Sequence, residues 1–132
     1  MRRRPLLNYR RRKSREIKFY ENIVKESPNF YQALVCLGNA YTRAGFWEEG
    51  LVVDKKLCHL RPYDPVVFYN LACSYSLLGR IEAALAAFRK AVKLGYRDFN
   101  YAYADADLEN LRRDRRFQRF VRSIVKRNGK ER

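Results

Sequence analysis

Apolar residues in this chain follow the spacing of α-helices, and the pattern repeats after 34 residues. Near the start, Ile17, Tyr20, Ile23 and Val24 lie on one face of a predicted helix. A shift of 34 residues superimposes 31–64 on the next segment, pairing Leu37 with Leu71, Gly38 with Ala72, Tyr41 with Tyr75, Gly45 with Gly79, Leu51 with Leu85 and Leu60 with Leu94. A fixed period in this range is typical of stacked repeats, in which each unit buries its apolar face against its neighbours.

The repeat phase and the turn residues predict the helix positions. We expect helices at about 14–26, 30–44, 47–60, 65–78 and 81–94. Pro28 ends the first, because proline disfavours helical geometry in the residue before it. Gly45 and Gly79 allow the positive φ of short helix–helix turns, and Asp64 followed by proline is a start signal.

A third copy does not follow, because a further shift of 34 residues places Asp105 on Leu71 and Glu109 on Tyr75. Residues 98–113 instead indicate a short helix and a turn, with Asp98 as N-cap. Asp114 then precedes a last helix with one apolar stripe, formed by Phe117, Phe120, Val121, Ile124 and Val125.

The repeated segments resemble the tetratricopeptide repeat, a helix–turn–helix unit of 34 residues. The residues that carry the resemblance are Leu34, Leu37, Gly38, Tyr41, Gly45 and Pro62 in the first copy, and Phe68, Leu71, Ala72, Tyr75, Gly79, Ala84, Phe88 and Ala91 in the second. Three positions depart from the pattern. Gly50 replaces an alanine, Asp54 stands where the second copy has Phe88, and Tyr96 replaces the late proline.

The resemblance implies an all-α fold of the tetratricopeptide type, an α-α superhelix. We expect two full repeats at 31–64 and 65–98, an N-terminal half-repeat at 14–28, and capping helices at 98–128. These would form a single domain at 14–128, preceded by a basic arm at 1–13 and followed by a tail at 129–132.

The formal net charge is +15, and it is concentrated at the two ends of the chain. Residues 1–18 and residues 112–132 each carry +8, which leaves −1 for the repeats between them. Such arms favour anionic partners. Three scattered cysteines (Cys36, Cys58 and Cys73) fit a reducing compartment. No apolar run approaches the length of a membrane span, so we predict a cytoplasmic protein. The Arg-rich start leaves an organelle transit peptide as an alternative.

The sequence favours a protein that is not an enzyme and has no metal and no cofactor. Cys58 and His59 are adjacent on a helix, so they point about 100° apart and do not form a preset nucleophile and base. Asp105, Asp107 and Glu109 lack the glycine turn of a calcium loop, and helix capping explains them better. Phosphate-binding glycine loops and serine nucleophile motifs are absent from the sequence.

The resemblance also implies a binding groove lined by the first helix of each repeat. Carried onto this chain, its positions are Gln32, Val35, Cys36, Asn39, Thr42, Arg43, Val66, Tyr69, Asn70, Cys73, Ser76 and Leu77. For Cys36, Cys73 and Leu77 we favour plain packing between helices. Asn39 and Asn70 match the two asparagines of a known carboxylate clamp, but Val35, Asn100 and Ala104 replace its basic residues, so we do not expect a clamp. For Asp54 we expect exposure to water, with a contact to Arg43 as the alternative.

These features predict an adaptor that binds a protein or peptide segment in the groove, and the basic arms favour an acidic one. The alternative is RNA or another polyanion bound by the arms, through Arg2, Arg3, Arg4, Arg10, Arg11, Arg12, Lys13, Arg115, Arg116 and Arg119. A third class is self-association through the ends of the stack, so the chain would be a monomer or a weak homo-oligomer.

Overall fold

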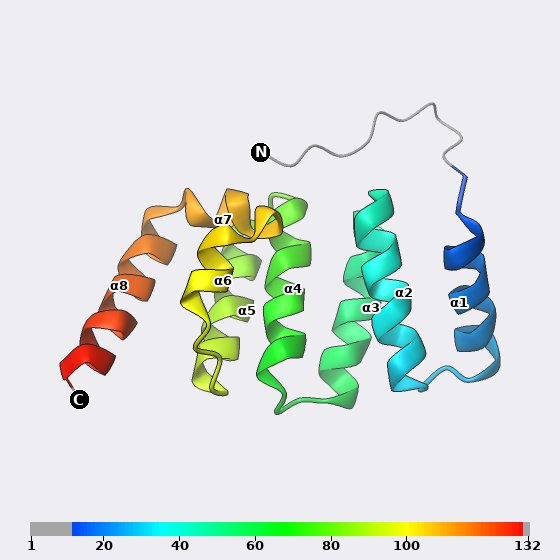
Figure 1. Cartoon of the computed structure of the whole chain (residues 1–132), viewed down its shortest axis with the longest axis horizontal. Helices are drawn as coiled ribbons and strands as arrows, with labels where there is room; N and C mark the ends of the chain where they lie inside the picture. The colour runs from blue at the N-terminus through cyan, green and yellow to red at the C-terminus, as the bar shows by residue number, and fades with distance from the viewer. Residues whose placement is uncertain (1–11, 131–132) are drawn as a thin grey trace.

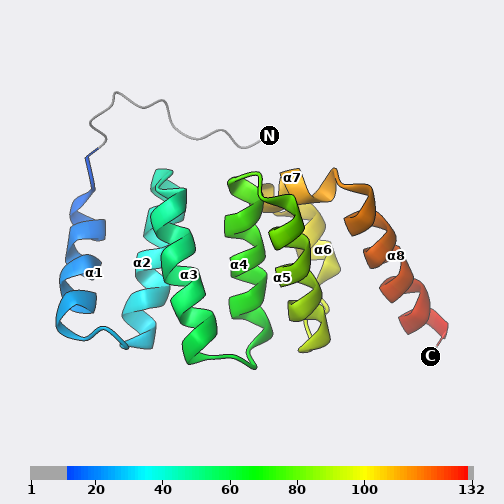
Figure 2. The same cartoon turned by 180° about the vertical axis from the view of Figure 1, so that it is seen from behind.

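Five helices of similar length stand side by side in the computed structural model, which describes residues 12–130 and the side chains of 12–128 (Figure 1). They are α1 (Arg15–Glu26), α2 (Tyr31–Ala44), α3 (Trp47–Leu60), α4 (Pro65–Leu77) and α5 (Ile81–Lys93). In Figure 1 α2 and α4 lie toward the viewer, whereas α3 and α5 come forward in Figure 2. The chain is therefore an all-α helical repeat, as predicted, and each helix begins and ends within one or two residues of its predicted bounds.

The helix ends follow from local chemistry. The Ser14 hydroxyl accepts a hydrogen bond from the amide of Ile17 at 3.1 Å, and the Asp64 carboxylate accepts one from the amide of Val66 at 2.8 Å. These bonds satisfy amides that have no partner within the helix. Gly45 and Gly79 adopt φ values of 83° and 74°, the left-handed geometry that lets the chain reverse between paired helices.

The core is divided into two clusters that meet at α4. The first joins α1, α2 and α3 around buried Ile17, Leu34 and Leu57. The second joins α4 and α5 to the C-terminal segment and is centred on Phe88, which is fully buried. The Phe88 ring lies 4.9 Å from that of Phe117 in an edge-to-face arrangement. The last helix is thus held by aromatic packing on the second repeat.

Three short elements and one long helix complete the chain: α6 (Phe99–Ala104), the 3₁₀-helix η1 (Ala106–Leu108), α7 (Glu109–Arg112) and α8 (Arg115–Lys130). Asp98 caps α6 by accepting from the amide of Tyr101 at 3.1 Å, and Asp114 accepts from the amide of Arg116 at 2.8 Å at the start of α8. Figure 1 shows α6 next to α4 on the same face as α2. This segment takes the place of a third repeat's first helix, although it is too short to be one.

At the two ends of the described chain, the structure can be compared with the predicted cap and the predicted basic arm. Helix α8 continues to Lys130, two residues beyond the predicted end of the cap. Of the predicted arm, residues 1–11 lie outside the described part. Lys13 pairs with Glu21 at 2.6 Å and lies 5.8 Å from the centre of the Tyr41 ring, so part of its charge is already compensated. Within residues 12–130, none of the helices has the length and apolar character needed to cross a bilayer.

Candidate functional site

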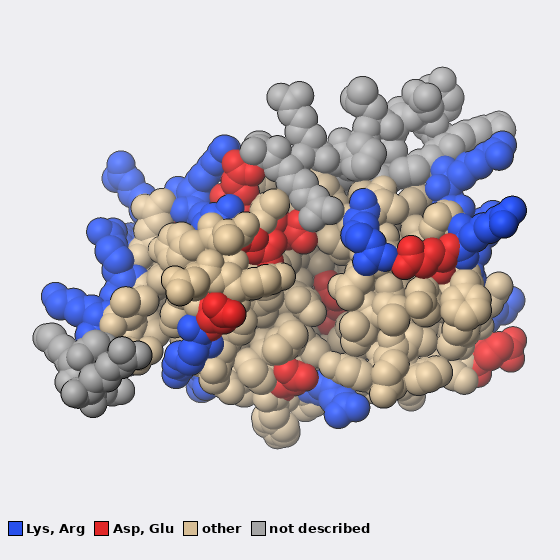
Figure 3. Space-filling model, viewed as in Figure 1, with Lys and Arg blue, Asp and Glu red and all other residues tan. Residues whose placement is uncertain are grey.

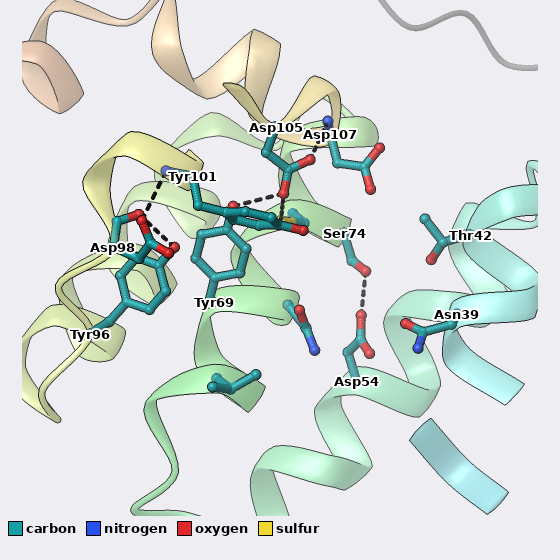
Figure 4. A pocket seen from close by; sticks show the side chains of 13 residues that line it. Asn39, Thr42, Asp54, Tyr69, Ser74, Tyr96, Asp98, Tyr101, Asp105 and Asp107 are labelled. Carbon is teal, nitrogen blue, oxygen red and sulfur yellow. Dashed lines mark hydrogen bonds between the residues drawn. The ribbon is translucent and has the colours of Figure 1, made fainter. Parts of the chain in front are cut away.

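A hollow of about 420 Å³ opens between α2 and the α6–η1 segment, with α3 and α4 beneath it (Figure 4). Its lining residues are Asn39, Thr42, Asp54, Val66, Tyr69, Asn70, Cys73, Ser74, Tyr96, Asp98, Tyr101, Asp105 and Asp107. Six of them belong to the groove that the sequence predicted, namely Asn39, Thr42, Val66, Tyr69, Asn70 and Cys73. The hollow is therefore built on the first helices of the two repeats and closed by the C-terminal cap.

The other predicted groove positions lie elsewhere. Gln32 is exposed and Val35 packs at the edge of the first core cluster. Arg43 pairs with Glu16 at 2.6 Å on the surface. The Ser76 hydroxyl is fully buried and accepts from the amide of Leu111 at 3.1 Å, so it anchors α7. Of the two remaining positions, Cys36 is half-buried and Leu77 is buried. Neither of them lines the hollow.

Tyr69 organises one wall of the hollow. Its hydroxyl donates to the Asp105 carboxylate at 2.7 Å, and its ring stacks on that of Tyr96 with centroids 4.6 Å apart. Burial raises the pKa of the Tyr69 hydroxyl far above its ordinary range, with the nearby Cys73 and Asp105 adding to the effect. Burial likewise raises the pKa of the Cys73 thiol, whose sulfur lies 3.7 Å from the same carboxylate. Both groups stay protonated and act as donors toward Asp105.

The structure contradicts the expectation that Asp54 is exposed to water. It neither reaches water nor contacts Arg43, because only 7% of its surface is exposed and its partner is the Ser74 hydroxyl on α4. Burial raises its pKa from 3.8 to about 7, and the Ser74 hydrogen bond opposes that rise only in part. Gly38 explains why the carboxyl fits: a Cβ there would lie 3.3 Å from Asp54 Oδ1. The position that holds Phe88 in the second repeat thus holds a buried polar pair in the first.

Three more carboxylates line the hollow: Asp98, Asp105 and Asp107. The sequence predicted only helix capping for them and did not indicate that they belong to a binding site. Asp98 and Asp105 do cap α6 and η1, and Asp105 accepts from the amide of Asp107 at 2.9 Å. Their second property, that they and Asp107 line the hollow, depends on where α6 and η1 dock against α4. The only signal in the sequence was the run of acids directly after the last repeat.

Two asparagines line the hollow, Asn39 from α2 and Asn70 from α4. Asn39 is exposed and Asn70 is half-buried. Within residues 12–130, neither side-chain amide forms a hydrogen bond to the protein. An amide offers both donor and acceptor atoms, so the pair can bond to the main chain of a bound segment.

Cys58 and His59, the residues considered for catalysis, lie outside the hollow. Cys58 is half-buried and its thiol donates to the carbonyl of Val67 at 3.5 Å, while His59 is exposed. Burial raises the pKa of Cys58 to about 12, which opposes formation of a thiolate nucleophile. Over residues 12–130, no three His, Cys, Asp or Glu side chains are placed to ligate one metal ion.

A second, basic hollow of about 330 Å³ lies between α5 and α8. Arg89, Arg116 and Arg119 line it together with Phe120 and Ser123. Arg116 pairs with Glu82 at 3.2 Å and with Asp114 at 3.0 Å, so its charge is partly compensated. Of the predicted polyanion residues, Arg12 and Arg115 are exposed away from this hollow, and those before Arg12 lie outside the described part.

Comparison with known proteins agrees with this architecture. Residues 65–98 match the family model described as "Tetratricopeptide repeat". The chain is also 34% identical over 90 residues to a protein of Arabidopsis thaliana whose description places it in the chloroplast. That alignment covers 66% of this chain but only 27% of the relative's length. The matched segment coincides with α4 and α5, which therefore form a tetratricopeptide repeat, and a helix pair of the same kind, α2 and α3, precedes it 34 residues earlier.

Proposed function

We propose that the protein is a non-catalytic adaptor that binds a segment of a partner protein in the hollow between α2 and α6. The observation that carries this proposal is the pair Asn39 and Asn70, which line the hollow and whose side-chain amides form no hydrogen bond within residues 12–130. Val66 is 54% exposed at the same surface and offers an apolar contact. Amides flanking an apolar patch are suited to an extended peptide, since they satisfy its main chain while its side chains pack between them.

The test is affinity capture from a lysate at two salt concentrations, with each retained protein then measured for direct binding. The site variant is Asn39→Ala, Asn70→Ala and Val66→Ser. The control is Asn100→Ala and Val52→Ser, which changes an exposed asparagine and an exposed valine outside the hollow. We expect the site variant to lose the partner and the control to retain it. If both bind the partner as the wild type does, the hollow is not the binding site.

A second candidate function is polyanion binding, as the sequence suggested, and the hollow between α5 and α8 favours it. Arg89 and Arg119 there carry charges for which no ion-pair partner occurs within residues 12–130. Phosphates reward such charge without a need for sequence readout, and the affinity falls steeply with salt. Titration of single-stranded RNA at low salt tests this function. The variant Arg89→Gln with Arg119→Gln should weaken binding and reduce its salt dependence, and the absence of binding at low salt would exclude it.

The cellular location that we propose is a reducing compartment, since Cys36, Cys58 and Cys73 are free thiols. The cytoplasm predicted from the sequence satisfies this, and so does the chloroplast named in the relative's description. The Arg-rich, acid-poor residues 1–13 match the composition of an import signal. Cell fractionation of the tagged chain, with N-terminal sequencing of the recovered protein, distinguishes the two locations.

A further inference from the structure

The charge of the hollow is opposite to that of the chain. The protein has 29 Lys and Arg against 14 Asp and Glu. Yet the described residues that line the hollow include four aspartates and neither lysine nor arginine. Figure 3 shows the same contrast, with red carboxylates near the middle of this face and most of the blue basic groups toward its two ends. The local field at the hollow therefore favours a cation within a protein that repels cations overall.

Asp54 adds a buried carboxyl group, one oxygen of which has no hydrogen-bond partner within residues 12–130. The other carboxyl oxygen accepts from Ser74. The side chain is 7% exposed and lies at the floor of the hollow (Figure 4). A buried carboxyl oxygen without a hydrogen-bond partner is costly in either protonation state, so such groups in folded proteins are usually satisfied by a partner. A donor that enters the hollow would supply this partner.

The carboxylates nearer the surface are held in place by the cap. Asp105 receives hydrogen bonds from the Tyr69 hydroxyl, the Cys73 thiol and the Asp107 amide, which fix its orientation. Arg112 donates to the main-chain carbonyls of Ala102 and Asp105. The Arg112 guanidinium is therefore directed at backbone oxygens, and the donors to the Asp105 carboxylate itself are all uncharged groups, so its negative charge is not neutralised by them.

The remaining wall is aromatic. Tyr96 stacks on Tyr69, and the Tyr101 ring lies 5.9 Å from that of Tyr69 with 58% of its own surface exposed. A cation held over a tyrosine ring gains a further attraction from the negative face of that ring. Arginine combines this with several fixed N–H donors that match carboxylates, and lysine has a flexible stem that packs on apolar surface.

From this lining we infer that the hollow is a pocket for an arginine or lysine side chain, presented by a basic segment of the partner protein. The inference rests on the proposed function and names the chemistry of the segment. Asn39 and Asn70 would hold its main chain, while the aspartates and tyrosines receive the cationic side chain. The expectation from the basic arms was an acidic segment, and at this site the carboxylates of Asp98, Asp105 and Asp107 would repel one.

The test uses the full chain and fluorescently labelled short peptides in which serine alternates with arginine, glutamine or glutamate. Anisotropy measures each affinity at low and moderate salt. We expect the arginine peptide to bind about tenfold or more tightly than the glutamine peptide, because one hydrogen bond to a charged group contributes on that scale. The net charge of +15 opposes non-specific attraction of this peptide, so its binding reports the hollow.

The decisive variant is Asp98→Asn, Asp105→Asn and Asp107→Asn, since asparagine keeps the capping ability of aspartate and removes its charge. The control is Glu16→Gln, Asp64→Asn and Glu82→Gln, which changes the net charge equally outside the hollow. Circular dichroism shows that each variant is folded. We expect the first to abolish the preference for arginine and the control to keep it.

Other outcomes overturn the inference. Equal or tighter binding of the glutamate or glutamine peptide does so, as does arginine binding that survives the three aspartate changes. If the Asn39, Asn70 and Val66 changes still abolish capture of the natural partner, the adaptor function stands without this inference. If neither set of changes alters any binding, both fall. Binding seen only after Arg2, Arg3, Arg4, Arg10 and Arg11 are changed to glutamine would assign the hollow to the chain's own arm instead of a partner.

Discussion

The buried carboxyl of Asp54 makes the stability of the fold depend on pH in a direction opposite to that of most aspartates. Burial raises its pKa from 3.8 to about 7 in the folded protein. Between these values the unfolded chain has released the proton and the folded chain still holds it. The slope of the unfolding free energy against pH is proportional to the number of protons bound by the unfolded state minus the number bound by the folded state. In this pH range the folded state binds more protons, so the slope is negative. The contribution of Asp54 is therefore most favourable below pH 4 and is lost as pH rises to 7.

The magnitude follows from the same two values. One pKa unit corresponds to about 1.4 kcal/mol, so a rise from 3.8 to about 7 makes folding up to roughly 4 kcal/mol less favourable above pH 7 than below pH 4. That is a large share of the roughly 5–15 kcal/mol by which a typical domain is stable. Asp54→Asn removes the titration while keeping an acceptor for the Ser74 hydroxyl.

The assay is urea unfolding followed by circular dichroism at intervals between pH 4 and pH 8. We expect the free energy of unfolding of the wild type to fall by up to roughly 4 kcal/mol relative to that of Asp54→Asn over this range. Asp64→Asn, at the α4 N-cap, is the matched control and should leave the wild-type slope in place. Ser74→Ala should move the end of the fall to higher pH, because the Ser74 hydrogen bond lowers the pKa of Asp54. Parallel curves for the wild type and Asp54→Asn would refute the reasoning.

Three further predictions concern the frame around the site. Phe88→Ala should lower the free energy of unfolding by about 3–5 kcal/mol, because it empties the fully buried centre of the second core cluster; thermal unfolding measures this, and a loss below about 1 kcal/mol would contradict it. Gly79→Ala should cost about 1 kcal/mol in denaturant titration, since φ is 74° there, and Gly79→Asn should cost less. The Arg116 guanidinium holds the pKa of Asp114 at about 2, so the contribution of the Asp114 carboxylate to folding stability is present above pH 4 and is lost as pH falls toward 2. In a titration of helicity against pH, Asp114→Asn should therefore reduce the loss of helix between pH 4 and pH 2.

The helical stack could be predicted from the sequence because its information is local and repeated. Each helix of the repeats is specified by a spacing of apolar residues, and its ends are set by caps such as Ser14 and Asp64 or by glycines such as Gly45. A unit that packs mainly on its neighbours needs no long-range information beyond its own period. Asn39 and Asn70 could be placed on the side of the stack that lines the hollow for the same reason, since the phase of the repeat fixes which side of a helix faces outward.

The character of the site could not be obtained in this way. Asp54 breaks the pattern of its own repeat, and whether a carboxyl there reaches water depends on Ser74 of the next helix and on the space left by Gly38. Ser76 occupies a groove position by phase, yet α7 covers it and uses its hydroxyl as an anchor. In both cases the outcome depends on residues more than a helix away.

The sequence by itself determined a tetratricopeptide stack with a neutral middle and basic ends. Only the tertiary structure decided that the hollow on this stack is acidic, because Asp98, Asp105 and Asp107 come from the end of the last repeat and the segment after it. Their capping role is a local property that composition and position predict. Their position around one hollow with Asp54 depends on tertiary packing. The segment of α6 and η1 packs back against α4, which brings these aspartates close to Asp54 of α3.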